Sequence, residues 1–313
     1  MSELKRMVVN VAVATVWTMP ESPRELDAPA LQRPVGLREW LESMTVDDRL
    51  DLCESNRVQS QLLYGTEVLA AEERGEWVQV LIPQQATPKN ELGYPGWVPR
   101  CQLAEATGAP AGAKRAEVIA DKAWLYANPD NSSEQLLELS FLTSLPVLDQ
   151  SGEWIKVHTP EGGEAYMKAD EVRLTDGLPA APRRDAGGGH AGHAVVEQAK
   201  RFLGLPYLWG GLSSFGYDCS GFAYSMHKYA GVLIPRDASA QARHGQLVER
   251  EQLEPGDLLF FAYEEGKGAV HHVGIYAGDG QMIHSPESGK CIELVDLSSY
   301  RLAKEHCVSR RYV

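Results

Sequence analysis

Residues 217–231 of the chain are Tyr-Asp-Cys-Ser-Gly-Phe-Ala-Tyr-Ser-Met-His-Lys-Tyr-Ala-Gly, and this stretch decides how the C-terminal part folds. After Cys219 the apolar residues recur at helical spacing, and Gly231 is a helix stop. The pattern therefore predicts a helix with Cys219 in its first turn. Unpaired backbone N–H groups and the positive end of the helix dipole favour a thiolate at that place. Because a thiolate at a helix N-terminus is a nucleophile, Cys219 is the candidate nucleophile of an enzyme.

A second stretch, residues 270–284, offers a base for this nucleophile. Residues 270–276 (Val-His-His-Val-Gly-Ile-Tyr) alternate as a strand, which turns His272 to one face and Val273 and Ile275 to the core. A tight turn, Ala-Gly-Asp-Gly, leads into a second strand that ends at His284. In such a hairpin His284 lies beside His272 and can accept its ring N–H. A cysteine, a histidine and a third polar residue form a nucleophile, a base and a group that orients the base.

Three further motifs accompany these two: Pro-Tyr-Leu-Trp-Gly-Gly at 206–211, Pro-Gly-Asp-Leu-Leu-Phe-Phe at 255–261 and Ile-His at 283–284. With all five in this order, residues 193–313 resemble the NlpC-type, papain-like cysteine peptidases. The resemblance implies an α+β papain-like domain with Cys219 as nucleophile, His272 as base and His284 as orienting group. It also implies an oxyanion site at Tyr207 and the Cys219 backbone N–H, and a substrate pocket walled by Trp209, Asp218 and Ser220.

The front part of the chain contains an internal repeat. Gly-Glu-Trp-Val-Gln-Val at 75–80 recurs as Gly-Glu-Trp-Ile-Lys-Val at 152–157, and each copy stands between two further short apolar segments. Short strands at regular spacing with turn residues between them predict small β-barrels. In this order they resemble the bacterial SH3-like barrel, a module often joined to cell-wall hydrolases. The expected fold is thus multidomain, with two small all-β SH3-like barrels followed by the papain-like domain.

We expect barrel one at residues 1–104, barrel two at 105–176, a linker at 177–192 and the peptidase-like domain at 193–313. Barrel one carries an insertion at about 22–56, in which residues 37–52 have the apolar spacing of a helical hairpin. The linker is predicted from its prolines and its run of three glycines. His190 and His193 are spaced like metal ligands on a helix, but glycine-rich surroundings give them no fixed geometry, so no metal site is expected.

Composition limits the partners. The 313 residues carry 43 acidic against 30 basic side chains, a formal net charge of −13, and residues 195–313 account for only 14 and 12 of these. The acidity therefore belongs to the front of the chain. It argues against nucleic acid, anionic membranes and anionic wall polymers as partners.

The N-terminus and the cysteines bear on the compartment. From Val8 the sequence predicts a buried strand instead of a signal peptide, and no apolar run is long enough to span a membrane. We expect a cytoplasmic protein; a secreted one whose leader has been removed is the alternative. Because the five cysteines include no Cys-x-x-Cys pair, neither a disulfide framework nor a zinc site is indicated. No cofactor is expected, Cys53, Cys101, Cys291 and Cys307 are expected to be packing residues, and His227, His244 and His306 to be surface residues.

The combination of two barrels with this peptidase resembles the γ-D-glutamyl-L-diamino acid endopeptidases of murein-peptide recycling (dipeptidyl-peptidase VI type). The shared segments are Ala-Thr-Val-Trp-Thr-Met-Pro at 14–20, Leu-Leu-Tyr-Gly at 62–65 and Gly-Tyr-Pro-Gly-Trp-Val-Pro at 93–99. The resemblance implies that Tyr94 meets the N-terminal L-Ala of the substrate. It also implies an acidic residue for the free amine, either Asp237 or Asp218, with Ser239 as a further substrate-binding residue. Gln59 stands where this subfamily leads us to expect a glutamate, so we expect no charged amine contact from barrel one.

The leading hypothesis is therefore a cysteine peptidase that cuts the γ-D-Glu–diamino acid bond of murein tripeptide, or related peptides, with a free N-terminal L-Ala. One alternative is a secreted endopeptidase that acts on intact peptidoglycan, and another is a non-catalytic SH3-like binding protein. The sequence leaves open diaminopimelate or Lys as the diamino acid, the oligomeric state, and which acid binds the amine.

Overall fold

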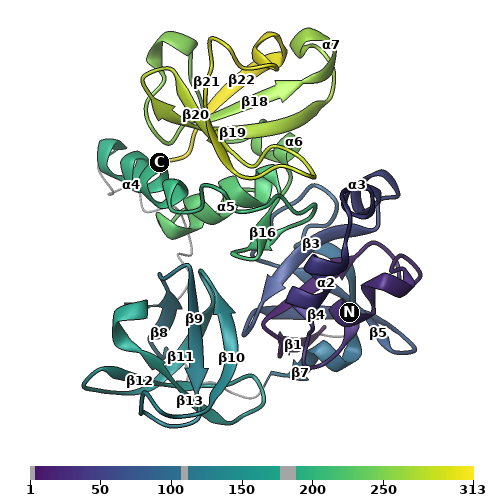
Figure 1. The fold of residues 1–313 in the computed structure, drawn as a ribbon, viewed down its shortest axis with the longest axis vertical. Coiled ribbons are helices and arrows are strands. Elements are labelled where there is room, and N and C mark those ends of the chain that lie inside the picture. Colours follow the sequence, from purple (N-terminus) through teal and green to yellow (C-terminus); the bar gives the residue numbers. More distant parts are fainter. Residues whose placement is uncertain (1–3, 107–111, 177–187) are drawn as a thin grey trace. The chain divides into compact units, whose positions relative to one another are not determined.

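The structure is a computed structural model that describes residues 4–106, 112–176 and 188–313 (Figure 1). The described residues fall into two compact units. The first holds both repeats of the front part of the chain together with Ser213–Phe215. The second holds the C-terminal part and the segment Gln84–Tyr94. This segment brings one predicted site residue, Tyr94, into the second unit.

The first repeat forms a seven-stranded sheet in the order β3-β2-β6-β5-β4-β1-β7. Its strands are β1 (Lys5–Val9), β2 (Val13–Trp17), β3 (Val58–Leu63), β4 (Glu67–Arg74), β5 (Trp77–Ile82), β6 (Tyr94–Pro99) and, after the 3₁₀ turn η2 (Arg100–Gln102), β7 (Leu103–Glu105).

The second repeat forms another seven-stranded sheet, in the order β10-β9-β13-β12-β11-β8-β14. Its strands are β8 (Arg115–Val118), β9 (Lys122–Tyr126), β10 (Gln135–Ser140), β11 (Ser144–Ser151), β12 (Trp154–His158), β13 (Glu164–Lys168) and, after η3 (Ala169–Glu171), β14 (Val172–Thr175). Each strand occupies the place of the strand seven positions earlier in the chain. The repeat that the sequence indicated is thus a repeat of the whole sheet.

Glycine at the same turn explains why the two copies share a Gly-Glu-Trp motif. Gly75 and Gly152 have φ angles of 56° and 59°, in the left-handed region that glycine adopts without strain. Each begins a two-residue hairpin loop, because Arg74 pairs with Trp77 and Ser151 with Trp154. The following β-branched residues then alternate into the core. In the second sheet the buried side chains facing one another are Val118, Leu125, Leu139, Leu145, Ile155, Val157 and Met167.

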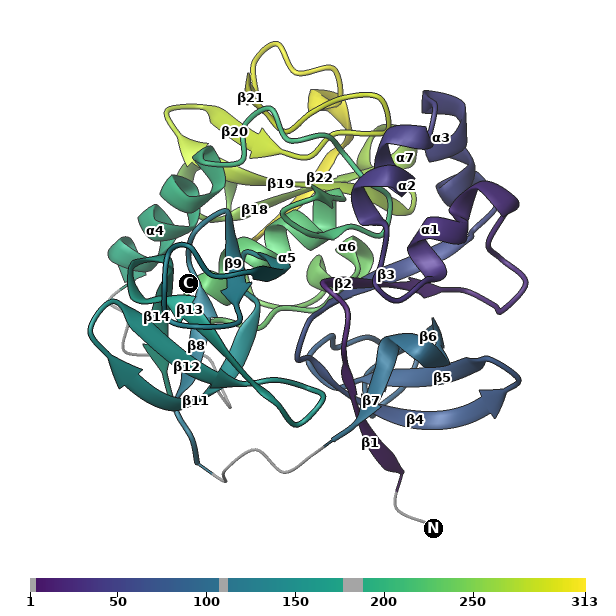
Figure 2. The same ribbon diagram turned by 60° about the horizontal axis from the view of Figure 1, so that its bottom comes forward.

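The insertion in the first repeat is helical, as the sequence predicted. It contains η1 (Glu25–Asp27), α1 (Ala28–Leu31), α2 (Leu37–Ser43) and α3 (Val46–Glu54), which lie grouped beside β2 and β3 in Figure 2. Trp40 of α2 packs on Trp17 of β2 with ring centres 6.1 Å apart, and its Nε1 donates to the buried Asp27 carboxylate at 2.7 Å. These contacts anchor the inserted helices to the sheet.

The second unit combines helices with a six-stranded antiparallel sheet in the order β17-β22-β18-β19-β20-β21. Its helices α4 (Gly188–Lys200) and α5 (Cys219–Tyr229) pack against β19 (Val270–Gly278) and β20 (Gln281–His284), along one face of the sheet (Figure 1). The remaining elements of the C-terminal part of the chain are β15 (Leu212–Ser213), β16 (Gly216–Tyr217), α6 (Ala238–Gln241), β17 (Gln246–Leu247), η4 (Arg250–Gln252), β18 (Leu258–Ala262), α7 (Tyr263–Gly266), β21 (Glu293–Asp296), η5 (Ala303–Glu305) and β22 (His306–Arg311). The expected α+β architecture is therefore present.

The start of α4 differs from the sequence-based expectation. The helix begins at Gly188, inside the predicted linker, whereas helical spacing was recognised only from Val195. Residues 177–187 of that linker lie outside the described residues. Close packing explains one glycine of this helix, because a Cβ on Gly192 would stand 2.0 Å from the Pro255 carbonyl oxygen. At Gly192, therefore, glycine is a requirement of helix packing.

Candidate active site

Asp218 places Cys219 at the first turn of α5, as the sequence predicted. Its side chain caps the helix, with Oδ1 accepting from the Gly221 backbone N–H at 2.6 Å and from the Ser220 hydroxyl at 3.1 Å. Gly221 is required here because a Cβ would lie 2.1 Å from the carbonyl oxygen of Gly211. The Asp218 cap and the close approach of Gly211 to Gly221 together fix the position of Cys219 at the start of α5.

The Asp218 carboxylate is itself held by a buried arginine that the sequence analysis did not single out. Arg236 donates from Nη2 to Oδ2 at 2.7 Å and from Nη1 to Oδ1 at 3.1 Å, and Nη1 also donates to the Ser220 hydroxyl at 3.0 Å. The two side chains are 1% and 9% exposed. Burial lowers the pKa of Arg236, but the Asp218 charge and hydrogen bonds, together with the Asp237 charge, outweigh burial and the net pKa is raised. The contact between the two side chains is therefore bidentate and charge-assisted.

The two predicted histidines meet across the β19–β20 hairpin. His272 Nε2 lies 2.8 Å from His284 Nδ1, and the ring planes are 80° apart. Both residues are buried, and two aromatic side chains of the core pack around them: Phe261 against His272 and Tyr300 against His284, with ring centres 5.9 Å and 5.1 Å apart. The nitrogen of His272 that remains for the thiol is Nδ1.

Cys219 reaches this hairpin from the helix side. Its sulfur takes backbone hydrogen bonds at Val273, the residue after His272, and at Ser220. The thiol therefore lies against β19 next to the histidine. The structure thus places Cys219 beside the strand that carries His272, and His272 beside His284.

The electrostatics of the thiol differ from the expectation. Burial raises the pKa of Cys219 to about 12, the Asp218 charge adds to the increase, and the hydrogen bond at Val273 offsets only part of it. Burial likewise lowers the pKa of His272 well below its usual value, and the neighbouring rings of His284 and His271 lower it further. Burial thus favours a neutral thiol beside a neutral imidazole in the free protein. This direction of the thiol pKa shift opposes the thiolate that the helix N-terminus was expected to favour, because burial penalises the charged form of the sulfur.

Tyr94 and Asp237 form a second cluster in the same unit. The Tyr94 hydroxyl donates to Asp237 Oδ1 at 2.9 Å, and Lys89 Nζ donates to the Tyr94 oxygen and lies 3.5 Å from Asp237 Oδ2. The Lys89 ammonium also lies 4.2 Å from the centre of the Tyr94 ring. Burial and the Asp237 charge raise the pKa of Tyr94, so the phenol stays protonated. The cluster thus holds one ammonium group between a carboxylate and an aromatic face.

The segment that carries Lys89 and Tyr94 is tied to the rest of the unit by main-chain contacts. The Arg236 N–H donates to the Ala86 carbonyl at 3.0 Å, and the Tyr224 hydroxyl donates to the Gln84 carbonyl at 2.8 Å. Arg236 precedes Asp237 in the chain and pairs with Asp218, which precedes Cys219. A short chain of contacts therefore joins the Tyr94 cluster to the cysteine.

The other predicted site residues are placed as follows. Tyr207 is buried and its N–H donates to the Lys290 carbonyl at 2.9 Å, Trp209 is half-buried, and Ser239 is exposed in α6. Ser220 is buried, with its hydroxyl bonded to Asp218 and Arg236. Their roles toward a substrate stay predictions.

Two other expectations were wrong. His227 was expected at the surface, but it is fully buried on α5, where its Nδ1 lies 2.8 Å from the Ala223 carbonyl oxygen and burial lowers its pKa to about 4. Cys101 and Cys291 were expected in the core, but both are exposed free thiols. Burial of a short polar or sulfur side chain depends on which helix or loop face is covered, which local spacing does not determine.

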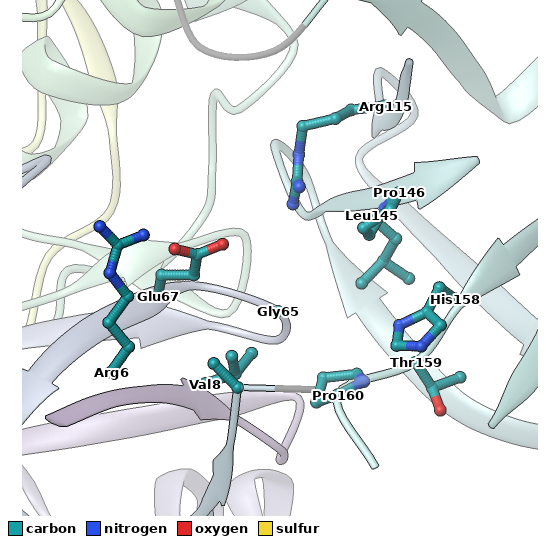
Figure 3. Close-up of a pocket in the computed structure, with 11 residues that line it drawn as sticks. Arg6, Val8, Gly65, Glu67, Arg115, Leu145, Pro146, His158, Thr159 and Pro160 are labelled. Atoms are coloured by element: carbon teal, nitrogen blue, oxygen red, sulfur yellow. The ribbon is translucent and has the colours of Figure 1, made fainter. Parts of the chain in front are cut away.

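The part of the chain that the structure describes holds no cluster of His, Cys, Asp and Glu suited to a metal ion. Within the same residues, none of the helices is long and apolar enough to cross a membrane. A cavity of about 300 Å³ in the first unit, shown in Figure 3, is lined by Arg6, Glu67, Arg115, His158 and their neighbours. It contains none of the predicted site residues, so the candidate active site is the cysteine–histidine cluster.

A cysteine at a helix start, a histidine pair on an adjacent hairpin and an α+β fold define a papain-like cysteine peptidase. Residues 204–311 match the model of the NlpC/P60 family, and residues 118–174 match that of the YKFC SH3b2 domain. A gamma-D-glutamyl-L-lysine dipeptidyl-peptidase of Bacillus subtilis (strain 168) is 45% identical over 300 residues, which cover 96% of this chain and 96% of that protein. A protein of the same name from Bacillus cereus (strain ATCC 10987 / NRS 248) is 40% identical over 314 residues, covering 97% and 90%.

Among solved structures, the crystal structure of a NlpC/P60 family protein from Bacillus cereus ATCC 10987 matches with a TM-score of 0.91 and 39% identity. The match covers 98% of this chain and 99% of that one. The chain belongs to the NlpC/P60 family of cysteine peptidases, with SH3-like domains in its front part.

The Asp218–Arg236 pair makes the first testable prediction. Arg236→Met leaves a buried carboxylate without its partner, and we expect it to lower the free energy of unfolding by about 3–5 kcal/mol. As a control, Arg301→Met removes a half-exposed partner of Glu287 and should cost less than about 1 kcal/mol. Urea unfolding followed by circular dichroism measures both. Equal, small losses in the two variants would contradict the assignment of Asp218 and Arg236 as a buried structural pair.

The raised pKa of Cys219 leads to a second prediction, on the pH dependence of alkylation. Alkylation requires the thiolate, whose fraction grows about tenfold per pH unit at any pH below the pKa. With a pKa of about 12, the rate at Cys219 should keep rising from pH 6 to pH 9. Iodoacetamide labelling, followed by mass spectrometry of the Cys219 peptide, separates this thiol from the other cysteines. A rate that is constant between pH 5 and pH 8 would instead indicate a thiolate–imidazolium pair.

Proposed function

We propose that this chain hydrolyses the bond between γ-D-Glu and the diamino acid of murein peptides that carry a free N-terminal L-Ala. Cys219 is the nucleophile, His272 the base and His284 the group that orients His272. The observation that carries the proposal is the pairing of this cluster with a second one, Tyr94 and Asp237, that suits an ammonium group. The names of the two Bacillus relatives, gamma-D-glutamyl-L-lysine dipeptidyl-peptidase, support the same substrate class.

The reaction follows from the neutral resting state. As the Cys219 sulfur attacks the γ-carbonyl carbon of D-Glu, its proton passes to Nδ1 of His272. The backbone N–H of Cys219 and the Tyr207 side chain are the proposed donors to the oxyanion. His272 then gives the proton to the amine of the leaving diamino acid, and the C–N bond breaks. A water molecule, deprotonated by His272, hydrolyses the thioester and releases L-Ala-γ-D-Glu.

The free amine of L-Ala provides the specificity in this proposal. An α-ammonium can bind the Asp237 carboxylate, the Tyr94 oxygen and the face of the Tyr94 ring, which are the acceptors that Lys89 uses in the free chain. We therefore assign the amine contact to Asp237. Asp218 is unsuited to it, because Arg236 already binds both of its oxygens. The substrate amine must displace the Lys89 ammonium to bind.

The net negative charge of the chain supports our choice of substrate and compartment. A net charge of −13, most of it in the front part, disfavours binding to an anionic wall polymer. We propose small peptides released from murein as the substrates, cleaved in the cytoplasm during recycling. We also propose that barrel one ends near residue 105 and that the peptidase domain begins near residue 193.

The third prediction tests this function. Purified chain incubated with L-Ala-γ-D-Glu-L-Lys, or with its diaminopimelate counterpart, should release L-Ala-D-Glu and the free diamino acid, both identified by liquid chromatography and mass spectrometry. Cys219→Ala should lose at least about 1000-fold of the activity, because no other group takes over as nucleophile. Cleavage by Cys219→Ala at the normal rate would contradict the mechanism. Release of fragments from insoluble sacculi, with no cleavage of the free peptides, would favour a wall endopeptidase instead.

A further inference from the structure

Nε2 of His284, the ring nitrogen that does not face His272, is an unsatisfied buried polar atom within the described part of the chain. The side chain is fully buried, and its Nδ1 faces His272, but among the residues that the structure describes Nε2 has no hydrogen-bond partner. Buried polar atoms are nearly always satisfied in native structures, so an unsatisfied one calls for an explanation. The Glu293 carboxylate oxygen Oε1 lies 3.4 Å from this nitrogen.

The proton positions in the relay determine what Nε2 must do. For His272 to accept the thiol proton at Nδ1, its neutral ring carries a hydrogen on Nε2, which then donates to Nδ1 of His284. A neutral His284 that accepts at Nδ1 carries its own hydrogen on Nε2. That hydrogen is directed to the side where Glu293 lies. A carboxylate there favours this tautomer of His284 and no other.

We propose that Glu293 is a positioning residue of this peptidase, which holds His284 in the Nε2–H tautomer and supplies the negative charge that a neutral third residue lacks. In the β20–β21 register Glu293 is the direct partner of His284, so the backbone holds the two side chains on neighbouring strands. When His272 takes the thiol proton and becomes an imidazolium, the carboxylate stabilises it through the His284 ring. The inference rests on the proposed roles of Cys219 and His272.

The other charged groups around His284 are engaged elsewhere. Arg301 and Lys290 both raise the local positive potential, and burial together with these two lowers the pKa of His284 to about 4. Glu287 binds both of them, Lys290 at 2.8 Å and Arg301 at 2.9 Å. Among the described residues the ion pair of Glu293 is with His284 alone. Glu293 is therefore the carboxylate that remains for the relay.

Kinetics test the proposal on L-Ala-γ-D-Glu-L-Lys. Glu293→Gln should lower kcat about tenfold with little change in KM, since the group acts through another residue and does not touch the substrate. The acid limb of the pH profile should move to lower pH, because loss of the negative charge makes His272 less basic. Glu293→Asp keeps the charge and should recover part of kcat. Glu197→Gln removes an exposed carboxylate of α4 that pairs with Lys200, and it is the matched control, expected to stay within twofold of the unchanged chain.

A kcat and pH profile for Glu293→Gln equal to those of the control would overturn the proposal, and so would an effect confined to KM. A spectroscopic readout does not depend on the substrate: in chain labelled with ¹⁵N-histidine, the imidazole signals of His284 should show hydrogen on Nε2 and none on Nδ1. Hydrogen on Nδ1 would also overturn it. If Cys219→Ala remained active, the proposed function would fail, whereas the tautomer of His284 would still decide the role of Glu293.

Discussion

The buried contact between Asp218 and Arg236 is the constraint on which both ends of the site depend. One oxygen of the carboxylate caps α5 and so fixes Cys219, while the guanidinium holds the carboxylate from the other side. The next residue after Arg236 is Asp237, which binds Tyr94. Two buried charges thus connect the nucleophile to the proposed amine site. Because an ion pair in a desolvated place is costly to break, the spacing between these two ends is held firmly.

The hydrophobic core determines the chemical state of the nucleophile and its base. Phe261 and Tyr300 pack on the histidine rings, and burial keeps His272 neutral while it raises the pKa of Cys219. A neutral pair stores no charge in the free protein and becomes charged only as the sulfur attacks. The surroundings that then stabilise the imidazolium are polar groups already in place, beginning with His284. The pairing of β19 with β20 holds His284 in place for this role.

Local pattern predicted much of this site, since a helix cap and strand alternation each involve neighbouring residues. The helix at Cys219 and the meeting of His272 with His284 were therefore predictable, as was the repeat of the two sheets. Arg236 and Glu293 were not, because their partners are fixed only by tertiary packing and neither belongs to a local motif. The direction of the thiol pKa shift was not predictable for the same reason: a helix N-terminus is visible in the sequence, whereas burial is not. The helical start at Gly188 was not predictable either, because glycines and prolines in this region are typical of a linker.

The proposed active site has Cys219 as its nucleophile and Asp237 as its amine-binding residue. A comparison of four rates tests this combination most directly. It measures kcat/KM for L-Ala-γ-D-Glu-L-Lys and for its N-acetylated form, in the unchanged chain and in Asp237→Asn. The account predicts that acetylation lowers kcat/KM by about 100-fold in the unchanged chain, because the carboxylate loses a charged partner, and by much less in Asp237→Asn. Equal rates for both peptides in the unchanged chain would contradict it.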